Sequence, residues 1–270
     1  MHLKEKIIQH YDEISPYYRD LWGVHIHHGY WKTGLESKEE AQGQLIEQLI
    51  ARAQIQPRAT ILDVGCGLGG TAIYLHKKLG GQVTGVTISP RQIQIGNELA
   101  LSRGADVRLV LMDAETLTLD GSFDVVLSVE AISHLSRKAD CFRSMARLLK
   151  AGGKLVIVDW FRSHTASPKQ EREFLHPIER AMLVPKLELP SVYMKHVTEM
   201  GVKVIEFEDL SAKVQKTWDL AIDLIRNPTL WKLAAARGRD FLAFLEGFRA
   251  MRAGYKSKAL IYGMLIGQRK

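Results

Sequence analysis

The stretch TILDVGCGLGG, residues 60–70, decides the fold of this 270-residue chain. Its mostly apolar first half is typical of a buried strand, and its glycine-rich second half leads into a helix expected from about Thr71 to Leu79. Gly65, Gly67 and Gly70 have the spacing G-x-G-x-x-G, which lets backbone N–H groups approach a ligand at a helix N-terminus. The stretch therefore predicts a ligand site at the carboxyl end of a strand.

Strand and helix patterns alternate along most of the chain. Apolar stretches with the length of strands lie at residues 60–64, 82–87, 107–112, 123–129, 154–160, 203–207 and 258–267. Helical patterns lie at residues 3–14 (ending before Pro16), 38–54, 71–79, 89–102, 212–226 and 230–255. This alternation is typical of a parallel sheet covered by helices on both faces. The predicted fold class is α/β, a Rossmann-like seven-stranded sheet.

Composition excludes several classes of protein. The chain is 46% apolar and 25% charged, which is close to an average globular protein and excludes disordered and collagen-like chains. No apolar run approaches the ~18 residues needed to cross a bilayer, and the first residues lead into no secretory signal. Cys66 and Cys141 cannot form a disulfide framework, which fits a reducing compartment. We expect a cytoplasmic location.

The net charge of +7 is concentrated at the C-terminal end. Residues 226–270 hold ten Lys/Arg against two acidic residues, so the rest of the chain sums to −1. A solvated helix face and tail explains this excess, and weak attraction to an anionic membrane surface or to an acidic ligand is the alternative. No DNA- or RNA-binding motif accompanies it, so nucleic acid is not an expected partner. The sequence does not indicate an oligomeric state.

The glycine loop has three interpretations. A dinucleotide would bind such a loop, but Asp63, two residues before the first glycine, would crowd a pyrophosphate. The next strand also ends at Thr87, where an NAD site has Asp or Glu. Turn geometry without a ligand stays open, as does a cationic ligand, which the carboxylate of Asp63 would favour.

Residues 62–70 resemble motif I of class I S-adenosylmethionine (SAM)-dependent methyltransferases. Three further stretches, 11–31, 85–92 and 254–263, resemble the tocopherol C-methyltransferase group and, more distantly, cyclopropane synthases and sterol methyltransferases. The resemblance covers essentially the whole chain. It implies SAM as the cofactor and a single domain. In that domain residues 1–56 form a lid, 57–160 the SAM-binding core, 161–255 an acceptor cap and 256–270 the final strand.

The resemblance also implies the cofactor contacts, residue by residue. Asp63, Gly65 and Gly67 would line the methionine half of SAM. Thr87 departs from the Asp or Glu that most class I enzymes place at this position, and it would share the ribose hydroxyls with Gln92. Asp113 would accept from the adenine amino group, unless it only caps a helix. Further contacts would come from Ala114, Val129, Tyr18 and His28.

The candidate catalytic residues follow the fourth strand. His134 resembles the general-base histidine of phosphobase N-methyltransferases, and Tyr11 matches the tyrosine that partners it there. A histidine suits removal of a proton from a phenol or ring carbon, although His134 could instead cap the next helix. Glu130 could orient His134 or contact the cofactor, and a surface carboxylate is the alternative.

The histidines at 25, 27 and 28 lack a Cys/Asp cluster with ligand spacing, so no metal is expected. They would serve packing or lid contacts.

The expected function is methyl transfer from SAM to a hydrophobic small molecule, aromatic or isoprenoid-like, in specialised metabolism. Phe, Leu and Met in residues 161–255 favour an apolar acceptor cavity, although a helical Phe stripe is also ordinary core. Carbon or oxygen is favoured over nitrogen as the accepting atom. Two alternatives remain: a SAM-binding protein without methyl transfer, such as a cyclase or regulator, and an NAD-dependent oxidoreductase.

Overall fold

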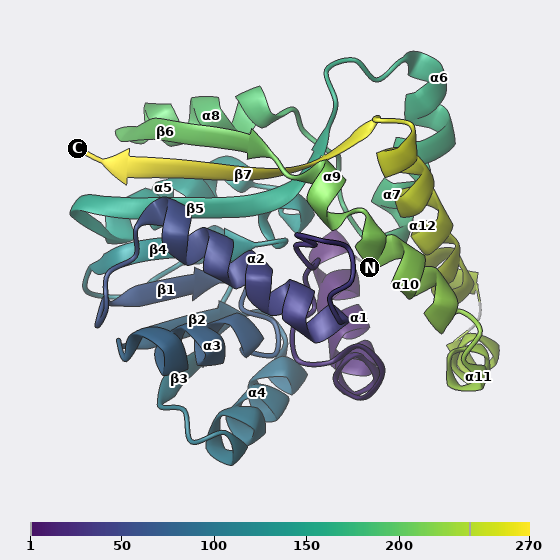
Figure 1. Cartoon of the computed structure of the whole chain (residues 1–270), viewed down its shortest axis with the longest axis horizontal. Helices are drawn as coiled ribbons and strands as arrows, with labels where there is room; N and C mark the ends of the chain where they lie inside the picture. Colours follow the sequence, from purple (N-terminus) through teal and green to yellow (C-terminus); the bar gives the residue numbers. More distant parts are fainter. Residues whose placement is uncertain (1, 238) are drawn as a thin grey trace.

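The computed structural model describes residues 2–237 and 239–270, without the side chains at 233–234, 236–237 and 239–240. Within these residues, seven strands form one sheet in the order β3-β2-β1-β4-β5-β7-β6 (Figure 1). The strands are β1 (Ile61–Val64), β2 (Val83–Thr87), β3 (Val107–Leu111), β4 (Phe123–Val129), β5 (Leu149–Arg162), β6 (Val202–Asp209) and β7 (Leu260–Arg269). The predicted fold class is confirmed.

The sheet is parallel except for β7, which runs antiparallel to its neighbours β5 and β6. Strand β5 is longer than the predicted 154–160, because Leu149 already pairs with Phe123 of β4. Strand β7 begins two residues later than predicted. The order of strands reverses between β1 and β4, and open α/β sheets bind ligands at such a point.

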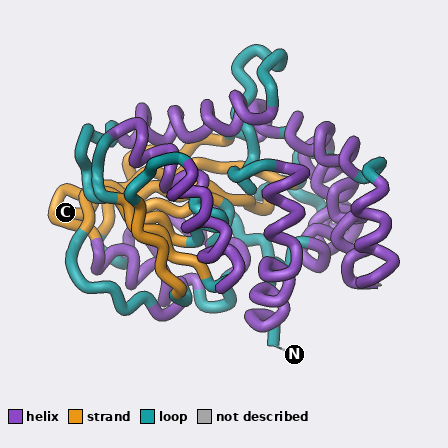
Figure 2. The backbone as a smooth tube through the Cα atoms, turned by 90° about the horizontal axis from the view of Figure 1, so that it is seen from below, coloured by secondary structure: helices purple, strands orange, loops and turns teal. Residues whose placement is uncertain are grey.

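Side chains that alternate along the strands fill two cores, one on each face of the sheet. Ile61 and Val156 belong to one core, and their neighbours Leu62 and Ile157 belong to the other. Figure 2 shows helices on both sides of the strands. The α-helices of ten or more residues are α1 (Leu3–Tyr17), α2 (Lys38–Ala53), α3 (Gly70–Leu79), α4 (Pro90–Ser102), α5 (Lys138–Leu148), α8 (Pro190–Glu199), α11 (Pro228–Arg237) and α12 (Arg239–Lys256).

Shorter helical segments connect these elements. They are the π-helices η1 (Tyr18–Trp22) and η4 (Glu171–Leu175), the 3-10 helices η2 (Ala114–Thr116) and η3 (Ile132–His134), and α6 (Pro168–Gln170), α7 (His176–Ala181), α9 (Ser211–Val214) and α10 (Lys216–Leu224). In the part of the chain described, no helix is long and apolar enough to cross a membrane.

Three helix predictions were wrong in their bounds. The first helix continues through Pro16 into η1, because Ile14 and Trp22 are buried and their packing outweighs the hydrogen bond lost at proline. The helix predicted at 212–226 is divided into α9, which packs on β7, and α10, which packs on α12. The helix predicted at 230–255 is divided into α11 and α12. Ala234 of its apolar stripe lies outside the described side chains, whereas Phe241, Phe248 and Tyr255 are buried.

Only part of the predicted lid lies over the ligand site. Helix α2 packs on the sheet, with Leu45 and Leu49 in the core, whereas α1 and residues 21–28 line the pocket described below. Near its start α1 is fastened by Lys4, whose Nζ lies 2.6 Å from Asp113 Oδ2. Further along the helix, Asp12 Oδ1 accepts from Ser89 Oγ at 2.5 Å and from the backbone N–H of Arg91 at 3.1 Å. Asp12 thus links α1 to the N-terminus of α4 by two hydrogen bonds.

Replacement of Asp12 by Ala should loosen the lid helix. Loss of two hydrogen bonds to a carboxylate at a helix N-terminus should lower the free energy of unfolding by about 1–2 kcal/mol. Amide hydrogen exchange should rise along α1. Lys6→Ala, on the exposed side of the same helix, should change neither quantity. Equal protection of α1 in both variants would show that Asp12 does not hold the lid.

Candidate active site

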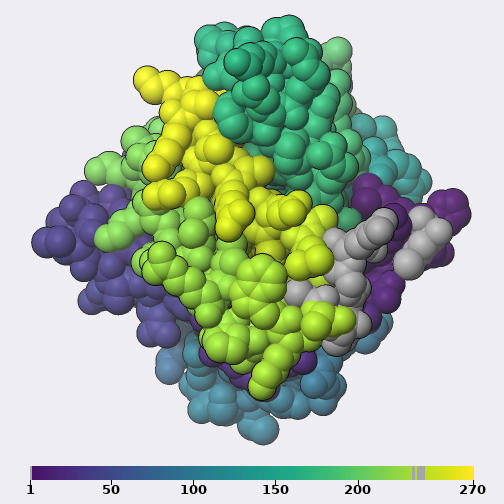
Figure 3. All heavy atoms as spheres, turned by 90° about the vertical axis from the view of Figure 1, so that its right-hand side faces the viewer, coloured from purple at the N-terminus to yellow at the C-terminus, as the bar shows by residue number. Residues whose placement is uncertain are grey.

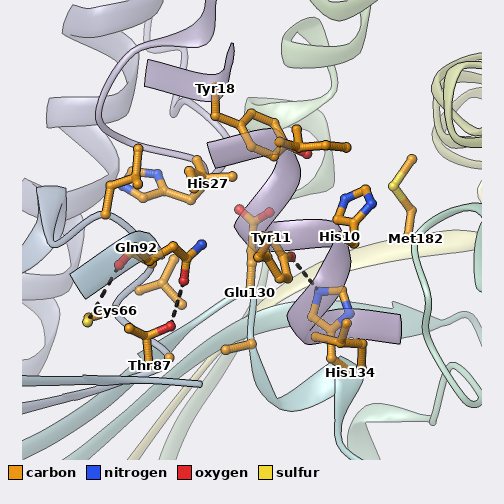
Figure 4. A pocket seen from close by; sticks show the side chains of 18 of the residues that line it. His10, Tyr11, Tyr18, His27, Cys66, Thr87, Gln92, Glu130, His134 and Met182 are labelled. Carbon is orange, nitrogen blue, oxygen red and sulfur yellow. Dashed lines mark hydrogen bonds between the residues drawn. The ribbon is translucent and has the colours of Figure 1, made fainter. Parts of the chain in front are cut away.

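A large pocket lies at the carboxyl ends of β1, β2 and β4, beneath α1. The glycine loop and the residues that end these strands line one part of it, and apolar side chains from α10, α11 and α12 line the other. Figure 4 shows Thr87 and Gln92 at one end and His10 and Met182 at the other, with Glu130 between them. The pocket therefore joins a polar half to an apolar half.

Two glycines of the loop differ in the space around them. Gly65 has φ +81°, and a Cβ there would lie 2.2 Å from the Cβ of Ala131, so the fold itself demands glycine. Gly67 has φ +54°, but a Cβ there would meet nothing closer than Ile26 Cδ1 at 3.5 Å. Packing thus explains Gly65, whereas the space beside Gly67 is available to a ligand.

Asp63 is a buried carboxylate without a complete set of partners. Its Oδ2 has no hydrogen-bond partner in the part of the chain described, and burial raises the pKa of this carboxyl to about 7. An unpaired carboxylate in a dry site is costly, and a cationic group is the partner that would stabilise its charged form. The ammonium group of SAM has this chemistry, so the residues present fit the cofactor.

The residues predicted to hold the ribose are already paired with each other. Thr87 Oγ1 donates to Gln92 Oε1 at 2.5 Å, and both side chains are buried in the pocket wall (Figure 4). Ser89 caps α4 by accepting from the Gln92 backbone N–H. The structure thus joins Thr87 and Gln92 as one polar unit.

Asp113 has two protein partners. Its Oδ1 accepts from the backbone N–H of Glu115 and caps η2, so the helix-cap interpretation is confirmed for this oxygen. Its Oδ2 is paired with Lys4, which also lies 2.8 Å from Glu115 Oε2. Asp113 and Ala114 line the pocket, and contact with adenine stays a prediction. Sequence reasoning missed Lys4, whose partners are more than a hundred residues away.

Tyr11 and His134 meet inside the pocket. Tyr11 Oη lies 3.2 Å from His134 Nε2, although the two residues are 123 positions apart (Figure 4). Burial lowers the pKa of His134 to about 4 and raises that of Tyr11, so both are neutral near pH 7. His134 Nδ1 lies 3.4 Å from the carbonyl of Leu183, which places the ring proton on Nδ1. Nε2 then carries no proton, and it accepts a hydrogen bond from the Tyr11 hydroxyl.

His134 does not cap the next helix. Helix α5 has Arg137 at its N-cap, and His134 belongs to the preceding η3. This leaves the imidazole of His134 facing the pocket.

Glu130 is a buried hub and not a surface carboxylate. Its Oε1 accepts from the His28 backbone N–H at 2.7 Å, from His28 Nδ1 at 2.9 Å and from Tyr262 Oη at 2.6 Å. Burial alone would raise the pKa of Glu130, but the hydrogen bonds that it accepts from His28 and Tyr262 hold its pKa below the ordinary value. No hydrogen bond joins Glu130 to His134 among the described contacts. The carboxylate therefore holds segments together.

His28 has both ring nitrogens occupied. While Nδ1 donates to Glu130, Nε2 accepts from Trp218 Nε1 at 2.6 Å and from Tyr255 Oη at 3.2 Å. The ring lines the pocket but has no hydrogen-bonding capacity left for a ligand. Tyr18 and Val129 line the pocket as well.

Of the other two histidines of the segment, His27 is buried and His25 is half-buried beside Gly70 of the glycine loop. His25 Nδ1 and His27 Nε2 lack hydrogen-bond partners in the described structure, and burial lowers the pKa of both rings. No group of three His, Cys, Asp or Glu residues able to hold a metal ion occurs among the residues described.

His10 is a pocket residue that sequence reasoning missed. Its ring lies 5.0 Å from that of Phe244, centroid to centroid, and burial lowers its pKa to about 4. Its place between Ile7 and Ile14 on the inner face of α1 was a signal that could have identified it.

Comparison with known proteins identifies the family. Residues 2–235 match the family model described as mycolic acid cyclopropane synthetase. A probable tocopherol O-methyltransferase of Oryza sativa subsp. japonica is 31% identical over 99% of this chain and 78% of its own length. The 27-O-demethylrifamycin SV methyltransferase of Amycolatopsis mediterranei (strain S699) is 30% identical over 89% of both chains.

Solved structures have the same fold. The mycolic acid cyclopropane synthase CmaA1 in complex with SAH and CTAB superposes with a TM-score of 0.84 at 22% identity, over 98% of both chains. The [4+2]-cyclase SpnF superposes with a TM-score of 0.82 at 24% identity, over 97% of this chain and 94% of its own. The family assignment overturns the NAD alternative. The chain belongs to the mycolic acid cyclopropane synthetase family and is a SAM-dependent methyltransferase.

Proposed function

We propose that the enzyme methylates a carbon or oxygen atom of an aromatic or isoprenoid-like molecule, and that His134 accepts the proton that this atom loses. The observation that carries the proposal is the Tyr11–His134 pair, which lies between the polar and apolar halves of one pocket. The names of the relatives support a hydrophobic acceptor, since they include tocopherol and 2-methyl-6-phytyl-1,4-hydroquinone methyltransferases.

The polar half would hold SAM. Its contacts would come from Asp63, Gly65, Gly67, Thr87, Gln92, Asp113, Ala114, Val129 and Tyr18. Bound SAM supplies an electrophilic methyl group. We assign His28 and Glu130 a positioning role, because the partners of both are protein groups on other segments.

The apolar half would hold the acceptor. Met182, Leu230, Phe241, Phe244 and Phe248 line it, and a cavity of this chemistry selects a molecule with little polar surface. When the Tyr11 hydroxyl turns from His134 Nε2 toward the acceptor, an acceptor hydroxyl or ring carbon near Tyr11 would present its proton to the vacated Nε2. The neutral imidazole can take this proton, and the Tyr11 hydroxyl can donate to negative charge that develops on the acceptor. The lid helix would keep water out of the site.

We also propose that the enzyme works in the cytoplasm and touches membranes weakly through basic residues. The two cysteines, Cys66 and Cys141, are buried and unpaired, which supports a reducing compartment.

Replacement of His134 by Gln should abolish most of the activity. The amide occupies a similar volume but cannot accept a proton, so kcat should fall about 100-fold or more. The dissociation constant of SAM, measured by calorimetry, should stay within about twofold, because His134 faces the acceptor half. Tyr11→Phe, which keeps the ring, should have a smaller effect. Full turnover by His134→Gln would remove this residue from the mechanism.

SAM binding should strengthen as pH rises. The Asp63 carboxyl, with its pKa raised to about 7, is mostly protonated at pH 6 and mostly ionised at pH 8. Only the ionised form attracts the ammonium group, so calorimetry should find affinity about tenfold higher at pH 8 than at pH 6. Asp63→Asn should bind SAM weakly with no such dependence. Affinity that is flat or falls with pH in the native enzyme would contradict this role.

A further inference from the structure

A basic groove lies behind α10, on the side away from the active site. Thr217 and Trp218 of this helix line the active-site pocket, whereas Lys216 and Asp219 line the groove. The groove is formed by residues 31–34, by the start of α10 with the preceding turn, and by the end of α12. Figure 3 shows the green and yellow C-terminal helices beside the blue-purple N-terminal segment.

Cations from three distant parts of the sequence gather in the groove. They are Lys32, Lys213, Lys216, Arg252 and Lys256. Asp219 is the one acidic residue among the lining residues, and it is paired with Arg252 at 2.5 Å. The groove therefore has a formal charge of +4. Only two of its cations belong to residues 226–270, so the basic C-terminal region is not the whole of this surface.

The lysines of the groove differ in their exposure and in their contacts. Lys216 Nζ lies 4.7 Å from the ring centroid of Trp31 and donates to the carbonyl of Gly34, which ties the loop to α10. The side chains of Lys213, Lys256 and Lys32 are exposed at the rim, and Lys213 Nζ also donates to the carbonyl of Lys32 at 3.4 Å. Like charges gathered in a concave surface attract anions more strongly than the same charges spread apart.

An apolar side chain projects from the same loop. Leu35 is 91% exposed, the highest value for a large hydrophobic residue in the described structure. The loop is held in shape by Glu36, whose carboxylate accepts from the backbone N–H groups of Lys32, Thr33 and Gly34 at 2.8–3.0 Å. Leu35 is therefore presented to solvent by a hydrogen-bonded turn.

We propose that the basic groove and Leu35 form a docking surface for a bilayer that contains anionic phospholipid. The cations would attract the headgroups, and Leu35 would enter the acyl region. A free phosphate ion would satisfy the cations but would leave Leu35 in water, so the bilayer fits both observations. The inference rests on the proposed function in one respect: an apolar acceptor dissolves in membranes, so docking would bring the enzyme to it.

The test is sedimentation of the full chain with vesicles of phosphatidylcholine, with and without phosphatidylglycerol. The native protein should bind the anionic vesicles only, and added salt should release it. Binding should weaken about fivefold for each cation removed, and Lys213→Gln/Lys256→Gln removes two. Leu35→Ser should weaken binding as well. Lys77→Gln/Lys195→Gln is the matched control, because it removes two exposed cations from α3 and α8.

Three outcomes would overturn the proposal. The groove variant and the control could bind alike, Leu35→Ser could bind as tightly as the native protein, or millimolar inorganic phosphate could displace the protein at constant ionic strength, which would indicate a site for the free ion. SAM affinity and turnover of a dissolved acceptor should be unchanged in every variant, since none of these residues lines the active site. If the native protein turns over a dissolved acceptor but does not bind anionic vesicles, the docking surface is refuted and the proposed function is not.

Discussion

One carboxylate oxygen joins the segments of this enzyme that surround the pocket. Oε1 of Glu130 accepts three hydrogen bonds, two from His28 and one from Tyr262, at the end of the central strand β4. His28 then receives hydrogen bonds from Trp218 and Tyr255 on the cap helices. Glu130 has φ +54°, which is an uncommon value for a residue with a side chain. The backbone is therefore locally strained at Glu130, and the surrounding contacts hold it in this conformation.

This hydrogen-bond network stabilises the fold because it is buried and nearly all of its polar groups have partners. A buried charge that loses one partner is costly, and a network with every member satisfied holds its segments in one geometry. The N-terminal lid, the last strand and the cap helices are thereby held at fixed positions around β4. Asp63 differs from Glu130: it is more fully buried, and its Oδ2 has no partner among the described residues. One carboxylate serves the fold, and the other is available to the cofactor.

Local chemistry in the sequence predicted the fold and a ligand site at the glycine loop, whereas the individual cofactor contacts were predicted through resemblance. Strand periodicity and the glycine spacing located β1 to β4, and the residues that end these strands necessarily meet at one edge of the sheet. The Tyr11–His134 pair was predicted only through resemblance, because 123 positions separate the two residues. The hub at Glu130 could not be predicted, since its partners come from segments whose contacts only the folded chain establishes. The same reason applies to Lys4 on Asp113 and to the basic groove.

The central claim is that SAM binds between the glycine loop and a lid whose position the Glu130 hub already holds. A crystal structure of the complex with S-adenosylhomocysteine tests it most directly. We predict that the amino group of the ligand becomes the partner of Asp63, while the hydrogen bonds of Glu130 and His28 stay as they are. A ligand bound elsewhere, or a hub that breaks to admit it, would contradict the account.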